Sequence, residues 1–402
     1  MKRRLVSILA AAAVFVTAAC GNTSAQSLET AAKETETAVQ TTEAEVQTTE
    51  TAAQTTEVNE SAETAETTAQ TAESAAQQEE KKSGGPGNHE GQGGPGGQRG
   101  GGMQDKSSDT ELQTMISEVA PKFELLTYED AENGTSLQYQ LFVPENYDAS
   151  QTYPLLQFIP DSSVVGKDAE TVLTQGWGGL VFATEEEQAK HPSFVVVPVF
   201  TETVVNDNFE HSEQIETAVR LIRSLTEQYS IDTDRIYTTG QSMGGMTSFY
   251  LNTAYPDLFA ASLFVGSQWD NSILSVLEDK DFFYIVAAGD PRASEGQAGL
   301  KAVFDEDQAV YSSAEWSAKD PQETQNAAVE AMIAEGNNAN FVTFTLGSTT
   351  ADGSTGNTMA GEHMTSFDYA YKIEAVRDWL YSQGELRHRL HDSIRGLEAR
   401  PC

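Results

Sequence analysis

Short β-rich apolar runs alternate with helical patterns along residues 109–383, and this alternation constrains the fold more than any other feature. The runs expected to form strands are 137–144, 153–161, 193–200, 234–240, 261–267, 281–290 and 340–347. Several of them are apolar almost throughout, which is typical of strands buried on both faces of a parallel sheet. The spacing of apolar residues predicts helices over 212–229 and 366–383, and a third from the turn after residue 240 through Tyr250. Repeated β-α-β units predict an α/β fold, a mostly parallel central sheet flanked by helices.

The chain is strongly acidic, with 61 acidic and 24 basic side chains in 402 residues. Residues 109–383 alone hold 43 acidic and 12 basic side chains, a net charge of −31. Because such a surface repels phosphates and anionic lipid, we expect no nucleic-acid partner. The two cysteines, Cys20 and Cys402, lie outside this segment. The predicted domain therefore has no disulfide, no thiolate nucleophile and no cysteine-bound metal.

The N-terminal residues 1–20 have the pattern of an export signal: a basic start, an apolar stretch of about a dozen residues, and small residues before Cys20. This ending resembles a bacterial lipoprotein box, which predicts lipidation of Cys20 and membrane attachment through that lipid alone. Thr17 departs from the box, so simple secretion and an uncleaved anchor stay open. In each case the chain is exported, to the cell surface or beyond it.

Two further segments differ from the central one in composition. Residues 21–108 are rich in Thr, Glu, Ala and Gln, then in Gly, and contain too few large apolar residues to offset the entropy of ordering. We expect them to form a disordered tether. Residues 384–402 reverse the charge trend, with 4 basic and 3 acidic side chains, and are interpreted as a tail that is foreign to the fold.

One motif carries the chemistry. The sequence Gly240-Gln-Ser-Met-Gly244 fits G-x-S-x-G and lies between a predicted strand and a predicted helix. In that context the glycines permit a strained turn that raises the Ser242 hydroxyl above the edge of the sheet. The first turn of the following helix offers unpaired N–H groups to an oxyanion. We therefore predict Ser242 as a nucleophile.

A serine nucleophile needs a base and an acid, which follow it in this order in chains with such a turn: serine, acid, histidine. Of the three histidines in 109–383, only His363 comes after Ser242, and we expect it in a loop before the closing helix. Asp290 directly follows the strand 281–290 and is the predicted acid, which would hold the imidazole. Glu295 and, less so, Asp305 remain alternatives.

The oxyanion hole should combine the backbone N–H of Met243 with one from the loop after the strand 153–161. Asp161 or Ser162 would supply that second donor. The sequence offers no phosphate loop, no dinucleotide glycine pattern and no metal-ligand cluster, so we expect neither a cofactor nor a metal.

With these residues in place, the chain resembles the esterase branch of the α/β-hydrolases. It is similar to feruloyl-esterase and polyhydroxybutyrate-depolymerase-like proteins, including a group labelled predicted peptidases. The resemblance rests on segments such as DTDRIYTTGQSMGGMTSFYLNTAYPDLFAAS and EHMTSFDYAYKIEAVRDWLYSQ and covers most of 137–383. It matches Ser242 to the family nucleophile, Asp290 to the acid and His363 to the base. The family usually has His-Gly where this chain has Pro160-Asp161, which puts a negative charge near the developing oxyanion.

The resemblance implies a membrane-anchored serine carboxylesterase that forms an acyl-enzyme. Acetyl or feruloyl esters of plant cell-wall polysaccharide are the expected substrates, and the acidic domain favours neutral over anionic ones. A serine peptidase on the same triad is one alternative. A non-catalytic binding lipoprotein is the other, although such a protein needs no serine on a strand-to-helix turn.

Overall fold

The computed structural model describes residues 105–350 and 358–384. The predictions about the export signal, Cys20, residues 21–104 of the tether and residues 385–402 of the C-terminal tail fall outside these residues. Within the described ranges, no helix combines the length and the apolar character needed to cross a membrane.

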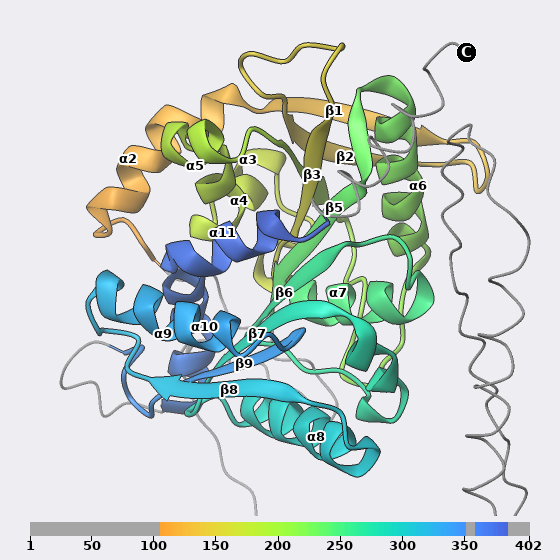
Figure 1. Cartoon of the computed structure of the whole chain (residues 1–402). Coiled ribbons are helices and arrows are strands. Elements are labelled where there is room, and N and C mark those ends of the chain that lie inside the picture. The colour runs from red at the N-terminus through yellow and green to blue at the C-terminus, as the bar shows by residue number, and fades with distance from the viewer. Residues whose placement is uncertain (1–104, 351–357, 385–402) are drawn as a thin grey trace, which may run out of the picture. The chain divides into compact units, whose positions relative to one another are not determined.

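The described residues form one sheet of nine strands, ordered β1-β2-β4-β3-β5-β6-β7-β9-β8 (Figure 1). The strands are β1 (Glu124–Asp130), β2 (Thr135–Phe142), β3 (Tyr153–Ile159), β4 (Phe194–Val199), β5 (Ile231–Gln241), β6 (Ala261–Val265), β7 (Asp281–Ala287), β8 (Tyr311–Trp316) and β9 (Ala339–Phe344). Strand β2 pairs antiparallel with β1 and β4, whereas the pairs from β4 to β8 are parallel. The predicted mostly parallel sheet is therefore confirmed.

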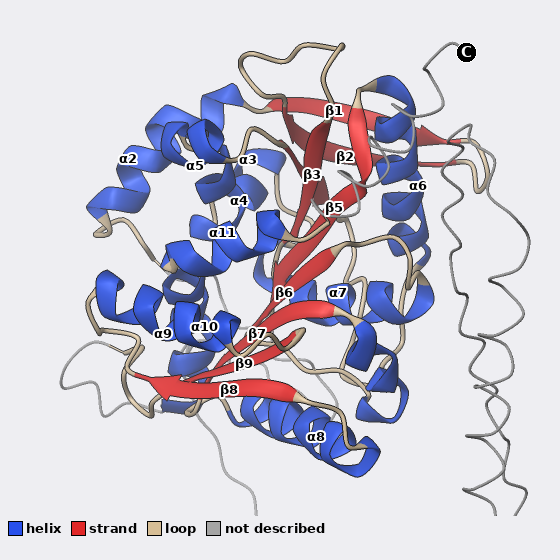
Figure 2. Ribbon diagram, viewed as in Figure 1, coloured by secondary structure: helices blue, strands red, loops and turns tan. Residues whose placement is uncertain are grey.

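Helices cover both faces of this sheet (Figure 2). They are α2 (Thr110–Val119), α3 (Ala169–Leu173), α4 (Trp177–Leu180), α5 (Glu185–Lys190), α6 (Glu213–Gln228), α7 (Met243–Ala254), α8 (Pro291–Asp307), α9 (Gln322–Ala334), α10 (Thr358–Lys372) and α11 (Glu374–Ser382). Short 3₁₀ turns occur at η1 (Ala120–Lys122), η2 (Ser162–Val164), η3 (Val181–Ala183) and η4 (Asn271–Asp279).

Alternate residues of the central strands supply two apolar cores, one on each face. In β7, Phe283 and Ile285 join the core beneath α2, α4, α9, α10 and α11, while Phe282 and Tyr284 join the core beneath α6, α7 and α8. Side chains along a strand point to opposite faces in turn, so a strand covered on both sides is apolar at most positions. This is why the uninterrupted apolar runs predicted these strands well.

Two local expectations were wrong. The closing helix predicted over 366–383 is two helices, α10 and α11, separated at Ile373, whose extended backbone (φ −74°, ψ 101°) ends the helical path. His363 lies within α10 rather than in a loop before it. The helix that carries His363 therefore reaches back toward the carboxyl edge of the sheet, where a loop was expected.

Candidate active site

Ser242 stands alone between the end of β5 and the start of α7. Its backbone has φ 51° and ψ −118°, a left-handed conformation that residues with a side chain rarely adopt. Its N–H donates to the carbonyl of Val265 in the neighbouring strand β6, at 3.0 Å. The sheet thus holds a turn whose strain costs on the order of 1–3 kcal/mol.

The glycines of the motif are needed for space rather than for a positive φ. A Cβ on Gly244 would lie 1.9 Å from the carbonyl oxygen of Ile159, and one on Gly240 would lie 2.3 Å from the carbonyl carbon of Gly244. Neither glycine has a positive φ. The glycines permit the turn by letting α7 approach the ends of β3 and β5, and the strained backbone conformation is that of Ser242 itself.

The structure brings the three predicted side chains together. Ser242 Oγ lies 2.9 Å from His363 Nε2, and His363 Nδ1 lies 2.5 Å from Asp290 Oδ2. The Asp290 side chain is 4% exposed and that of His363 is 29% exposed. These contacts make a continuous hydrogen-bonded path from the hydroxyl to a buried carboxylate.

Asp290 also caps α8. Its Oδ1 accepts from the N–H of Ala293 at 3.3 Å, so the carboxylate is fixed on the side away from the imidazole. Burial, and then the nearby charge of Asp290, raise the pKa of Tyr284 well above its ordinary value. Tyr284 therefore stays neutral beside Asp290, and its hydroxyl donates to the carbonyl oxygens of Ser267 and Ala293.

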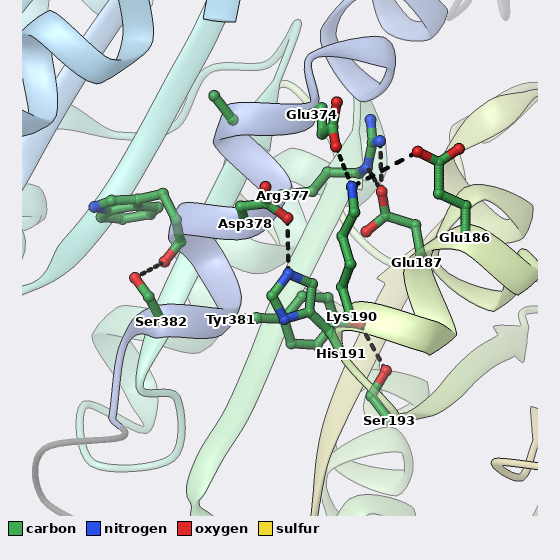
Figure 3. Close-up of polar contacts among 12 residues, drawn as sticks. Glu186, Glu187, Lys190, His191, Ser193, Glu374, Arg377, Asp378, Tyr381 and Ser382 are labelled. Carbon is green, nitrogen blue, oxygen red and sulfur yellow. Dashed lines mark hydrogen bonds and ion pairs between the residues drawn. The ribbon is translucent and has the colours of Figure 1, made fainter.

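The alternative acids lie elsewhere. Glu295 lines a surface cavity, and Asp305 accepts a hydrogen bond from the hydroxyl of Tyr311. The two other histidines of the predicted domain are engaged outside this cluster. His211 stacks on Tyr250. His191, which follows α5, contacts Asp378 of α11 at 2.7 Å and stacks on Tyr381 (Figure 3).

The predicted oxyanion hole lies between the start of α7 and the loop after β3. Met243 is the first residue of α7, so its N–H belongs to the first turn, which has no partner within the helix. Asp161 caps the 3₁₀ turn η2 and lies two residues after the end of β3. Its Oδ1 accepts from the N–H of Ser163 and its Oδ2 from Nε2 of Gln241, both at 2.8 Å. Both carboxylate oxygens are thus engaged, and one of them contacts the residue before Ser242.

A cavity of about 440 Å³ opens on the same edge of the sheet. Its lining includes Trp269, two residues after Ser267, and Arg292, two residues after Asp290. Phe209 lies edge-on to Trp269, and Asp207 forms an ion pair with Arg292. Two aromatic rings beside carboxylate and amide groups can accommodate a mixed polar and apolar molecule. Within residues 105–350 and 358–384, no group of three His, Cys, Asp or Glu side chains is arranged to hold a metal ion.

The fold is shared with a solved esterase structure. A thermostable esterase superposes with a TM-score of 0.53 at 23% identity, over 66% of this chain and 64% of that one, so the match spans less than two thirds of that protein. A ferulic acid esterase of the fungus Anaeromyces mucronatus (TM-score 0.40, 13% identity, 62% of this chain and 91% of that one) and an acetyl xylan esterase of Aspergillus awamori (0.34, 15%, 44% and 80%) also match. No protein-family model and no curated protein matches the sequence. The chain has the α/β-hydrolase fold.

Proposed function

We propose that this protein is a serine carboxylesterase in which Ser242, His363 and Asp290 form the catalytic triad. The observation that carries the proposal is the unbroken path of hydrogen bonds from Ser242 Oγ through the His363 imidazole to Asp290. The fold shared with a thermostable esterase supports it.

The reaction follows from this geometry. Ser242 Oγ attacks the ester carbonyl carbon while its proton passes to His363 Nε2, and Asp290 stabilises the imidazolium that results. The N–H groups of Met243 and Asp161 donate to the oxyanion. Collapse of the tetrahedral intermediate breaks the C–O bond, and the leaving alcohol takes the proton from His363. Water, activated by the same imidazole, then hydrolyses the acyl-enzyme.

The proposed substrates are acetyl or feruloyl esters of plant polysaccharide. The surface cavity described above supports this, because Phe209 and Trp269 offer apolar surface while Asp207, Asn271 and Glu295 offer acceptors for hydroxyl groups. A carboxylate-rich wall disfavours anionic esters.

We also propose that Cys20 carries a lipid that holds the enzyme at the cell surface. A Cys20→Ser chain should then lose incorporation of a labelled fatty acid, and retained label would contradict the proposal.

The test compares the full chain with Ser242→Ala on p-nitrophenyl acetate, methyl ferulate and acetylated xylan. Loss of the nucleophile should lower kcat by about 10⁴-fold or more. Ser248→Ala is the matched control, because it removes a buried hydroxyl from the same helix and should keep kcat. Activity that survives in Ser242→Ala would overturn the triad. A peptide amide cleaved faster than these esters would replace the esterase proposal with a peptidase.

A further inference from the structure

A buried carboxylate that the reaction does not use lies directly before His363. The side chain of Glu362 is completely enclosed, at 0% exposure. Its Oε2 accepts from the N–H of Gly289 at 3.1 Å, and its Oε1 accepts from the N–H of Gly347 at 2.8 Å. One side chain of α10 therefore joins the loop after β7 and the loop after β9.

The contact with Gly289 is matched in shape as well as in hydrogen bonding. A Cβ at position 289 would lie 2.2 Å from both Cδ and Oε1 of Glu362. Only glycine leaves room for the carboxylate there. Gly347, in contrast, has a φ of 78° and open space around its Cα, so its glycine serves the turn rather than the contact.

The contact joins the residues directly before two members of the proposed triad. Gly289 directly precedes the acid Asp290, and Glu362 directly precedes the base His363. We propose that Glu362 is a positioning residue that fixes the acid loop to α10 and so sets the contact between Asp290 and His363. This rests on the proposed function of the triad. Other contacts hold α10 as well, since Thr365 bonds to Thr349 and the His363 ring lies edge-on to Phe367, but the Glu362 carboxylate reaches the residue next to the acid.

The physical argument is one of pre-organisation. A misplacement of about 1 Å in a catalytic group lowers a rate by about 100-fold, although binding of the substrate is little affected. Glu362→Gln replaces one acceptor oxygen by an amide that would point its hydrogens at a backbone N–H. The acid loop must then shift relative to α10.

We therefore expect Glu362→Gln in the full chain to lower kcat by about 10–100-fold on p-nitrophenyl acetate, with KM within about twofold. Glu362→Asp keeps the charge but has a side chain one methylene shorter. Its kcat should lie between those of wild type and Glu362→Gln. Glu187→Gln is the control, because Glu187 is also buried and pairs with Arg377 of α11 (Figure 3). It should lower the Tm and leave kcat unchanged. Equal kcat in wild type and Glu362→Gln would overturn the inference.

A double-mutant cycle isolates the contact itself. Gly289→Ala should lower kcat strongly when Glu362 is present, because the new methyl collides with the carboxylate. In the Glu362→Ala background the same substitution should change kcat by less than about threefold. Equal fold-changes in both backgrounds would contradict the proposal. The single Gly289→Ala variant leaves Glu362 intact and so serves if the Glu362 variants fail to fold.

A second measurement needs no turnover. The hydrogen bond between His363 Nδ1 and Asp290 should give a low-field proton resonance in the full chain, assigned by its loss in His363→Gln. We expect Glu362→Gln to move or abolish this resonance, whereas Glu187→Gln should retain it. An unchanged resonance in Glu362→Gln overturns the inference. A wild type that hydrolyses no ester but shows these shifts would instead contradict only the proposed esterase function.

Discussion

Backbone strain at this site falls on Ser242 itself, not on the glycines beside it. A φ of 51° in a residue with a Cβ is held by the N–H bond to Val265 and by the close packing of Gly244 on β3. Strain of this kind persists only where the surroundings over-determine the conformation. The proposed nucleophile is thus a position where the fold gives up stability.

Replacing Ser242 should therefore raise stability in one variant and not in another. Ser242→Gly removes the Cβ and its strain, whereas Ser242→Ala keeps both. Relief of about 1–3 kcal/mol is partly offset by about 0.5–1 kcal/mol of added chain entropy in the unfolded state. We expect the free energy of unfolding of the glycine variant to exceed that of the alanine variant by about 1 kcal/mol. Urea titrations in which the two variants have equal m-values would measure this difference. A less stable glycine variant would mean that the turn is not strained.

Asp161 stands where the resembled family has a glycine, and its carboxylate is engaged rather than free. Asp161→Asn would point an amide toward either Ser163 N–H or Gln241 Nε2, leaving a buried donor unsatisfied at about 1–3 kcal/mol. We expect lower stability and lower kcat, because the loop that carries the second oxyanion donor moves. Asp168→Asn, which caps α3 through the N–H of Thr171, should change neither. A kcat that rises would show that the negative charge opposes the reaction.

The order of residues in the chain predicted the three side chains of the proposed triad, and the structure brings these side chains together. The sequence did not indicate a role for Glu362, because a glutamate next to a histidine is also common on an exposed turn of a helix. Only its contact with Gly289, 73 residues away, distinguishes it. Contacts between distant segments leave no pattern that one sequence can reveal.

Individual elements are joined by a few buried polar contacts. The first strand, β1, ends at Asp130, whose side chain accepts from Nε of Arg220 and from Oγ1 of Thr217 in α6, both at 2.8 Å. Burial alone would raise the pKa of Asp130, but these hydrogen bonds outweigh it and hold the pKa below its ordinary value. The antiparallel edge of the sheet is thereby fixed to the helix that covers it.

The sign of this pKa shift predicts how stability depends on pH. A folded-state pKa below that of the unfolded chain adds stability above about pH 4, and this is lost as the pH falls through the folded value. Asp130→Asn should lower the unfolding free energy by about 3 kcal/mol at pH 7. The difference from wild type should shrink below pH 4 in denaturant titrations. Glu132→Gln removes an exposed carboxylate 3.6 Å from the same Arg220 and should show neither effect.

The elements that sequence patterns missed are those with weak apolar signals. The edge strand β8 (YSSAEW) is half exposed and mostly polar, so its pattern differs little from that of a loop. Helix α8 (PRASEGQAGLKAVFDED) buries Ala293, Gln297, Leu300 and Phe304, too few large apolar residues to form a clear stripe. The doubly covered central strands were predicted because burial on two faces favours apolar residues at most positions.

Taken as a whole, the predicted domain carries a charge of −31 and presents its cavity in that field. Repulsion of this kind acts over the Debye length, about 30 Å at 0.01 M salt and about 3 Å at 1 M. For the proposed esterase, this field should favour neutral over anionic esters before any contact is made.

Salt should therefore change the selectivity between esters. Between 0.01 M and 1 M NaCl, kcat/KM for mono-p-nitrophenyl succinate, which is anionic, should rise several-fold, because screening removes the repulsion. The value for neutral p-nitrophenyl acetate should stay within about twofold and serves as the control. A flat or falling profile for the anionic ester would show that the field does not reach the site.

Ser242, Asp290 and His363 come from three stretches separated by 48 and 73 positions of the chain. During synthesis, all strands of the described sheet have been made once Phe344, the last residue of β9, has been added. The chain still lacks the imidazole until residue 363 has been added. The proposed hydrolytic centre is thus the last working part of the domain to be completed during synthesis. A nascent chain exposes a serine that is already encoded but has no base to activate it.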